Sequence, residues 1–170
     1  MSLTIEHKGV LRQVQRTIQY HSLLDSNSRV LIACSGGVDS LALVHALLAL
    51  REHMKKGWTL AIATVDHEIR PEGAAELELV RSMADDLGLP FYGAHIDVPA
   101  QAQALGLSLE TAGRRARYAF LSNIALEEDY DVVATGHHQN DQAETILAHM
   151  VRGTGLRGLG GMAYTRPLVG

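Results

Sequence analysis

The stretch RVLIACSGGVDSLALVHALLAL, residues 29–50, decides the fold of this chain. It places a short polar turn, SGGVDS at residues 35–40, between two apolar runs. The first run, residues 29–33, is short and continuous, which is typical of a strand buried on both faces of a sheet. The second, residues 38–54, is long enough for a helix. The pattern therefore predicts a strand, a tight turn and a helix.

The same alternation continues along the chain. Further strands are expected at residues 58–65, 91–96 and 131–135. Helices are expected at residues 4–22, 73–87, 108–128 (with Ser108 as its cap) and 142–151, and residues 99–106 are predicted to form a loop. This order predicts an α/β fold, a Rossmann-like parallel sheet with helices on both faces. Ligands bind beyond the carboxyl ends of such strands, where the loops at 34–40, 66–72, 97–107 and 136–141 would gather.

Composition narrows the classes of function. The chain has 170 residues, of which 46% are hydrophobic and 20% charged, and this suits one globular domain. No apolar run reaches the roughly 18 residues of a membrane span, and the amino terminus has no signal-peptide core, so we expect a cytoplasmic protein without a membrane partner. The single cysteine, Cys34, excludes an internal disulfide. A net charge of −4 leaves only local patches for nucleic acid.

The SGGVDS turn has the composition of an anion site. Gly36 and Gly37 let the backbone come close to a ligand, and the start of the following helix favours a phosphate or pyrophosphate. Ser35 and Ser40 add hydroxyl donors. Asp39 would repel a phosphate unless a cation lies between them, which indicates Mg²⁺. The alternative is a tight strand-to-helix turn in which the serines and the aspartate serve only as caps.

Acidic residues near the end of the chain form a second candidate group. His137, Asp141 and Glu144 are spaced i, i+4 and i+7, so one helical face would present all three. Two carboxylates on such a face can hold Mg²⁺ or an ammonium group. The alternative is a solvated helix start, with Asn140 or Asp141 as its cap.

Basic residues form two further groups. Arg114 and Arg117 share one helix face while Arg115 points elsewhere, and a solvated helix surface is the alternative to a role in charge stabilisation. His67 and Arg70 follow the second strand, where Arg70 could face phosphate or RNA and His67 could simply cover the end of the sheet.

These stretches carry a family resemblance. SGGVDS resembles the PP-loop of the ATP pyrophosphatase family, whose members cleave ATP between its α and β phosphates. Three other stretches resemble the tRNA(Ile)-lysidine synthetase family: VDHEIRPEG at 65–73, LETAGRRARYAFL at 109–121 and ATGHHQNDQAETILAHMVRGTGLRGLGGM at 134–162. The resemblance covers nearly all of residues 29–168. It departs at Gly113, where that family usually has alanine, and this would loosen the helix.

The resemblance implies an adenine nucleotide alpha hydrolase-like fold. Residues 1–152 would form the PP-loop domain, and residues 153–170 a glycine-rich loop and the start of a segment that continues in the family. It implies a ligase that adenylates C2 of the wobble cytidine of tRNA(Ile) and then joins lysine there, releasing AMP and pyrophosphate. ATP and Mg²⁺ would be its cofactors, and tRNA(Ile) and free lysine its substrates. A homodimer stays open as its assembly.

The resemblance also assigns roles to individual residues. Catalytic roles fall on Asp39, Arg114, His137, Asp141 and Glu144, with Asp39 and Asp141 as the metal ligands. ATP would be bound by Ala33, Ser35, Gly36, Gly37, Val38, Asp39, Ser40, Val65, His67 and Gly136. RNA would be bound by Arg70, Arg117, Arg152 and Arg157.

Two other functions stay open. One is a different PP-loop reaction on RNA, such as thiolation, although sulfur-transferring relatives generally work with cysteine pairs and this chain has only Cys34. The other is a nucleotide-binding module that holds ATP but is inactive without a further part of the protein.

Overall fold

A computed structural model gives the structure of the chain and describes residues 5–136. Along the chain, the elements are α1 (Ile5–Tyr20), β1 (Arg29–Ala33), α2 (Val38–His53), β2 (Thr59–Asp66), α3 (Gly73–Asp86), β3 (Phe91–His95), α4 (Val98–Leu105), α5 (Leu109–Glu127) and β4 (Val132–Thr135). Most of these bounds lie within one or two residues of those expected from the sequence. The helix expected at 142–151 lies outside the described residues.

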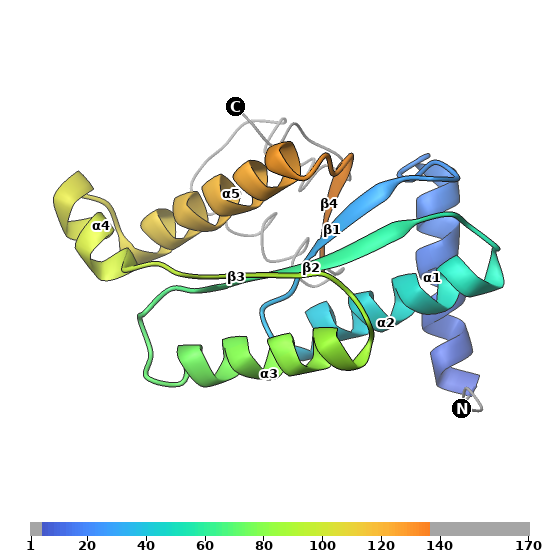
Figure 1. The fold of residues 1–170 in the computed structure, drawn as a ribbon, viewed down its shortest axis with the longest axis horizontal. Helices are drawn as coiled ribbons and strands as arrows, with labels where there is room; N and C mark the ends of the chain where they lie inside the picture. Colours follow the sequence, from blue (N-terminus) through green and yellow to red (C-terminus); the bar gives the residue numbers. More distant parts are fainter. Residues whose placement is uncertain (1–4, 137–170) are drawn as a thin grey trace, which may run out of the picture.

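The four strands form one parallel sheet in the order β3-β2-β1-β4 (Figure 1). The chain moves outward from β1 to β2 and β3, and then returns to place β4 on the other side of β1. The two directions of winding meet between β1 and β4, where open α/β sheets bind their ligands. The predicted α/β class and the parallel sheet are confirmed.

Alternation along β1 divides its side chains between two cores. Val30 and Ile32 pack with α1, α2 and α3, whereas Leu31 packs against α5 on the opposite face. Figure 1 shows α2 and α3 below the sheet and α5 above it. Residues buried on both faces of a sheet have to be apolar, which explains the run VLI that follows the exposed Arg29.

Helix α4 replaces a predicted loop, and the prediction for residues 99–106 is therefore wrong. Asp97 caps this helix, because its Oδ1 accepts a hydrogen bond of 2.8 Å from the backbone N–H of Ala100. Gly106 ends it in the left-handed conformation, at φ 63°. The helix packs against α5 through small side chains, which are Val98, Ala102, Ala112 and Ala116.

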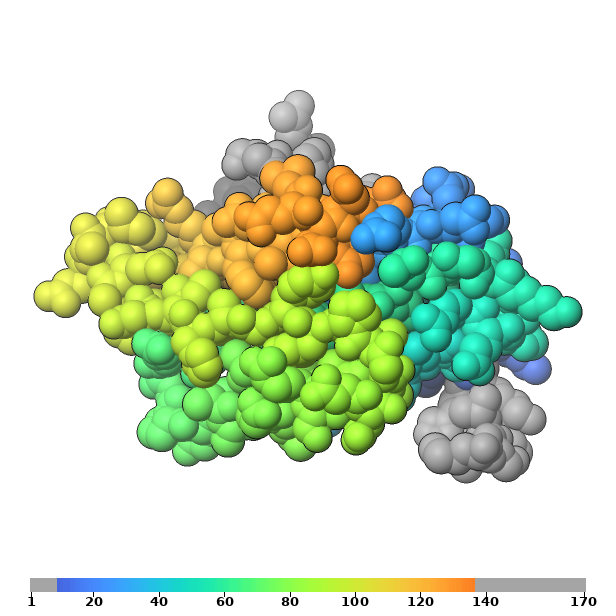
Figure 2. All heavy atoms as spheres, viewed as in Figure 1, coloured from blue at the N-terminus to red at the C-terminus, as the bar shows by residue number. Residues whose placement is uncertain are grey.

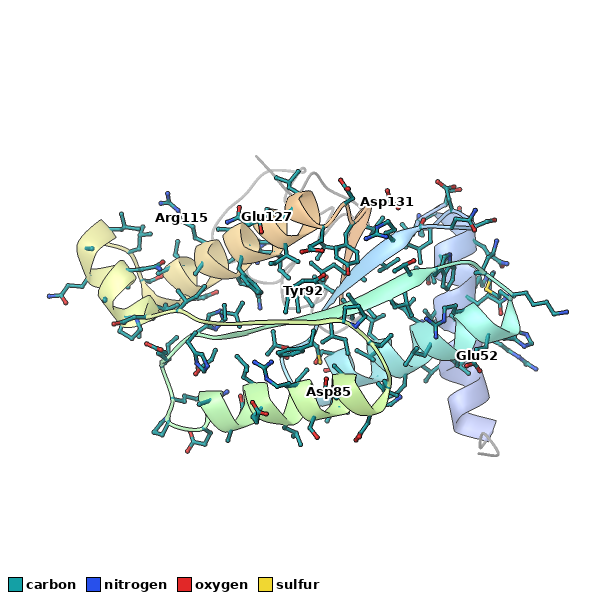
Figure 3. All side chains as sticks on the ribbon, viewed as in Figure 1. Glu52, Asp85, Tyr92, Arg115, Glu127 and Asp131 are labelled. Carbon is teal, nitrogen blue, oxygen red and sulfur yellow. The ribbon has the colours of Figure 1, made fainter. Side chains whose placement is uncertain are left out.

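Helix α5 begins as the sequence predicts. The Ser108 hydroxyl oxygen accepts a hydrogen bond of 3.2 Å from the backbone N–H of Thr111. Figure 3 shows Tyr92 of β3 lying between the sheet and α5, and Arg115 on the outer side of α5. Because Arg115 points away from the sheet, it takes no part in the interior of the molecule.

The same view in space-filling form shows the outer surface of these layers (Figure 2). Residues of α3 and of the segment after it, drawn in green, cover the centre of this face, and α5 lies above them. No helix within residues 5–136 is both long and apolar enough to cross a membrane.

Candidate functional site

A cavity of about 380 Å³ opens at the carboxyl edge of the sheet. Its walls come from the ends of β1, β2 and β4, the starts of α2 and α3, and one face of α5. Ten of the residues expected at the site line it: Ala33, Ser35, Gly37, Asp39, Ser40, Val65, His67, Arg70, Arg117 and Gly136. The loops after β1, β2 and β4 therefore meet, as the parallel sheet predicts. In the described part of the chain, residues 97–107 do not line this cavity.

The SGGVDS turn is organised around the hydroxyl of Ser40, which is buried. This hydroxyl donates a hydrogen bond of 2.8 Å to the backbone oxygen of Gly37 and accepts one of 3.2 Å from the backbone N–H of Ser35. Its oxygen also lies 3.4 Å from Ser35 Oγ and 3.5 Å from Cys34 Sγ. The Ser40 hydroxyl thus links residues of the turn to one another, and its single proton is donated within the turn.

Glycines hold the rest of the turn open. Gly36 has φ 80°, a conformation that costs little only for glycine. Gly37 stands at the N-cap of α2 with extended backbone, and no side chain caps the helix there. Since the first amides of a helix have no partner within the helix, they can meet an anion. Val38 is 82% exposed and, like Gly36, is not among the residues that line the described cavity.

Gly136 closes the site from the side of β4. A Cβ atom at this position would lie 3.1 Å from three backbone atoms of the α2 start: Asp39 O, Ser40 N and Ser40 Cα. Two backbones therefore approach each other closely here, and a side chain at this position would require one of them to shift. This contact explains the glycine that the sequence places directly after the fourth strand.

A buried carboxylate stands at the end of β2. Asp66 accepts a hydrogen bond of 2.9 Å from the backbone N–H of Glu68, and its other oxygen lies 3.0 Å from Nδ1 of His95 on β3. Burial opposes ionisation of Asp66, but the Glu68 N–H and the His95 ring outweigh it and hold its pKa below the ordinary value. A Cβ at Gly73 would overlap this carboxylate, so glycine is required at the start of α3.

His67 follows directly on this strand. Burial lowers its pKa, and the positive charge of Arg117 lowers it further, against the opposing effect of Asp66. Its Nε2 atom is buried and has no hydrogen-bond partner among the described residues. His67 is thus a neutral polar group on the wall of the cavity.

The two arginines of α5 differ in position. Both lie over the Tyr118 ring, with guanidinium carbons 5.2 Å (Arg114) and 5.5 Å (Arg117) from its centre. Arg117 is half-buried and lines the cavity, whereas Arg114 is exposed and does not line it in the described residues. Arg70 also lines the cavity, and it pairs with Glu76 at 3.0 Å.

Several residues that line the cavity are not predicted as site residues from the sequence. Thr64 lies within the strand expected at 58–65 and Asp66 begins the loop expected at 66–72, and the sequence assigns neither of them a role. Glu76 and Leu77 reach the cavity from α3. Two polar residues, Thr64 within the apolar strand and Asp66 at its end, are a signal that could have indicated this wall.

The fit for Mg²⁺ rests on Asp39. It lines the cavity beside the turn, and Mg²⁺ is commonly held by one or two carboxylates together with phosphate oxygens and water. Within residues 5–136 there is no group of three or more His, Cys, Asp or Glu side chains placed to hold a metal ion. Asp39 therefore fits a metal that is shared with a bound phosphate. The predicted residues His137, Asp141, Glu144, Arg152 and Arg157 lie outside the described residues.

A glycine-rich turn between β1 and α2, facing a cavity at the carboxyl edge of a parallel sheet, defines a nucleotide-binding α/β protein. The PP-loop domain family matches residues 8–170, and the chain belongs to this ATP-utilising family.

The chain is also similar to individual curated proteins, and this similarity is more specific than the family match. The chain is 40% identical over 153 residues to a tRNA(Ile)-lysidine synthase of Thermosipho africanus, covering 90% of this chain and 35% of that protein. It is 38% identical over 156 residues to a tRNA(Ile)-lysidine synthase of a Nostoc species, covering 92% of this chain and 43% of that protein. The chain thus spans less than half the length of these relatives.

A solved structure supports the fold. The U34-tRNA thiolase of Methanococcus maripaludis, solved with its iron–sulfur cluster, has a TM-score of 0.71 and 19% sequence identity to this chain. The match covers 87% of this chain and 51% of that one. At this identity the likeness concerns the fold alone.

Proposed function

We propose that this chain is the ATP-activating part of a tRNA(Ile)-lysidine synthetase. The observation that carries the proposal is the cavity, which brings the SGGVDS turn together with the ends of β2 and β4 and with Arg117 of α5. The two lysidine synthase relatives, 40% and 38% identical over about nine tenths of the chain, support the same reaction.

ATP would lie with its phosphates on the turn from Ser35 to Ser40. The open amides at the start of α2 favour the negative charge, and the glycines allow close approach. Asp39 would hold Mg²⁺, whose positive charge would offset the repulsion between this carboxylate and the phosphates. Ala33, Val65 and Gly136 would contact the nucleoside at the strand ends, and His67 would add a neutral polar group.

The reaction would take two steps. The C2 oxygen of the cytidine attacks the α phosphorus of ATP, a P–O bond forms, and pyrophosphate leaves. The free amine of lysine then attacks C2, a C–N bond forms, and AMP leaves with the oxygen while the amine loses a proton. Arg114 would offset the developing phosphate charge, and His137, Asp141 and Glu144 would handle lysine and nucleotide, with Asp141 also near the metal.

The remaining assignments complete the proposal. Arg70, Arg117, Arg152 and Arg157 would meet the phosphates of tRNA(Ile). Residues 1–152 would form the PP-loop domain, and residues 153–170 a separate glycine-rich segment. We also propose a cytoplasmic location, and a homodimer that light scattering of the purified chain would reveal by its mass.

The test is pyrophosphate release by the chain in the presence of ATP, Mg²⁺, lysine and tRNA(Ile). We expect release that depends on the tRNA, and Asp39→Asn should abolish it because the metal loses a carboxylate. Asp86→Asn, at an exposed position at the end of α3, is the matched control and should leave release unchanged.

Two results would redirect the proposal. ATP binding without tRNA-dependent release would reduce this chain to a nucleotide-binding module that requires a further part of the protein. Mass spectrometry of the modified nucleoside separates the other alternative, because a sulfur substituent in place of lysine would identify a thiolation enzyme.

A further inference from the structure

The sequence indicates that Ser40 supplies a hydroxyl donor to the phosphates, but the structure uses this proton elsewhere. A backbone oxygen can only accept, so the bond of 2.8 Å between Ser40 Oγ and Gly37 O takes the single proton of Ser40. The backbone N–H of Ser35 occupies one of its lone pairs. Ser40 therefore shapes the turn and has no proton left for a ligand.

Another hydroxyl lies on the same face of the sheet. Thr64 follows Leu60 and Ile62 in the alternation of β2, and these two side chains pack in the core that also contains Cys34. Cys34 is next to Thr64 across the sheet, because its N–H donates to the oxygen of Ala63 at 2.9 Å. Cys34 Sγ in turn lies 3.5 Å from Ser40 Oγ. Thr64 thus faces the side on which the turn lies.

Thr64 is buried, and within residues 5–136 its hydroxyl has no partner. Its side chain is 4% exposed, and Oγ1 has no hydrogen-bond partner among the described residues. On the other flank, its register partner is Gly93, which has no side chain that could accept a bond. Thr64 nevertheless lines the cavity together with Ser35, Gly37 and Ser40. A buried hydroxyl without a partner costs free energy, so its retention at this point indicates a ligand.

We propose that Thr64 donates a hydrogen bond from Oγ1 to a phosphate oxygen of the bound nucleotide, as a binding residue supplied by β2 rather than by the turn. Phosphate fits because the hydroxyl lies on the face of the sheet where α2 begins, and a phosphate oxygen accepts strongly from a neutral donor. The inference rests on the proposed function, since it assumes that the cavity holds ATP.

The proposal has a thermodynamic signature that a structural role would not produce. Thr64→Val keeps the shape of the side chain and removes the unpartnered hydroxyl. Without ligand, the melting temperature should therefore rise by about 2 to 4 °C. With ATP, the variant should lose between about 10-fold and about 100-fold in affinity, the usual range for a bond to a charged group. Thr64→Ser keeps the donor and should bind ATP about as well as the wild type.

Isothermal titration calorimetry of the whole chain with ATP, pyrophosphate and adenosine tests this. Thr64→Val should weaken ATP and pyrophosphate binding and leave adenosine binding unchanged. Thr17→Val is the matched control, because the Thr17 hydroxyl donates to Gln13 O at 3.0 Å within α1, and Thr17 is not among the described residues that line the cavity. This control should change no affinity.

The outcomes separate the two proposals. If the wild type binds ATP and Thr64→Val binds it equally well, the role of Thr64 is refuted and the proposed function stands. If adenosine binding falls by the same factor as ATP binding, the hydroxyl contacts the nucleoside, and the phosphate assignment is wrong. If the wild type binds no ATP at all, the proposed function fails, and the inference fails with it.

Discussion

The two faces of the sheet are filled in different ways. On the side of α1, α2 and α3, strand β2 contributes Leu60 and Ile62 to a core of large branched side chains and Trp58. On the side of α5, the same strand contributes Ala61 and Ala63. Ala63 also lines the cavity. The larger core therefore lies on the side of α1, α2 and α3, while the cavity at the carboxyl edge is lined from both faces, by Thr64 on one and Ala63 on the other.

The largest expected effect tests where the stability lies. Ile62 and Ala61 are adjacent, and both are 0% exposed. Ile62→Ala should lower the free energy of unfolding by about 2 to 5 kcal/mol, because it leaves a cavity in the larger core. Ala61→Gly should cost only about 1 kcal/mol. Urea unfolding followed by circular dichroism measures both, and equal losses would contradict the difference between the two faces.

The next effect concerns the edge where the larger core meets the cavity. Gly73→Ala would push a methyl group into the Asp66 carboxylate, which is held by Glu68 and His95. We expect a loss of about 1 to 3 kcal/mol in the free energy of unfolding. Gly9→Ala is the control, since among the described residues nothing outside the backbone of α1 itself lies within 4 Å of the added carbon. An equal loss in the free energy of unfolding in both variants would contradict the explanation by overlap with Asp66.

A smaller effect depends on pH. The pKa of Asp66 is lower in the folded chain than its ordinary value of 3.8, so its ionised form stabilises the fold fully above that value. This contribution is lost as the pH falls through the lower folded pKa. Asp66→Asn should therefore cost about 1 kcal/mol near neutral pH, and less and less below pH 3.8. The exposed Asp86→Asn should show no such convergence with the wild type in urea titrations.

The smallest effect is a gain. Gly113 lies within α5 and is buried, yet a Cβ there would meet, among the described residues, Val98 Cγ1 at an ordinary 3.7 Å. Gly113→Ala should raise the free energy of unfolding by about 0.5 to 1 kcal/mol, because alanine favours the helix. Thermal unfolding measures this. A loss instead would mean that the contact between α4 and α5 is tighter than its distances indicate.

Local signals in the sequence were enough for most of the fold. Strands β1 and β2 are largely apolar runs buried on both faces, and such runs can be recognised from the sequence alone. Helix α4 is the exception, since the sequence predicts a loop there although Asp97 and Gly106 mark both ends of the helix. The turn SGGVDS and its place at the sheet edge also followed from local sequence.

The details of the site could not be predicted in this way. The proton of Ser40 is directed by a backbone oxygen three residues away, which no composition rule indicates. The surroundings of the Thr64 hydroxyl depend on its neighbours on β1 and β3, and these neighbours are known only from the register of the sheet. Likewise, the spacing of Arg114 and Arg117 puts them on one helix face without saying which of them reaches the cavity.

Gly136 follows β4 and completes the nucleotide site by its contact with the start of α2, and this has a consequence for the order of folding. Strand β4 pairs with β1 across about a hundred residues, as in Val30 with Val132, whereas β1 and β2 are close in sequence. Distant pairings close slowly, so we expect β4 to dock last. The nucleotide site would then become competent only at the end of folding. In a refolding experiment, ATP affinity should return with the slowest phase, and its return in an earlier phase would refute this order.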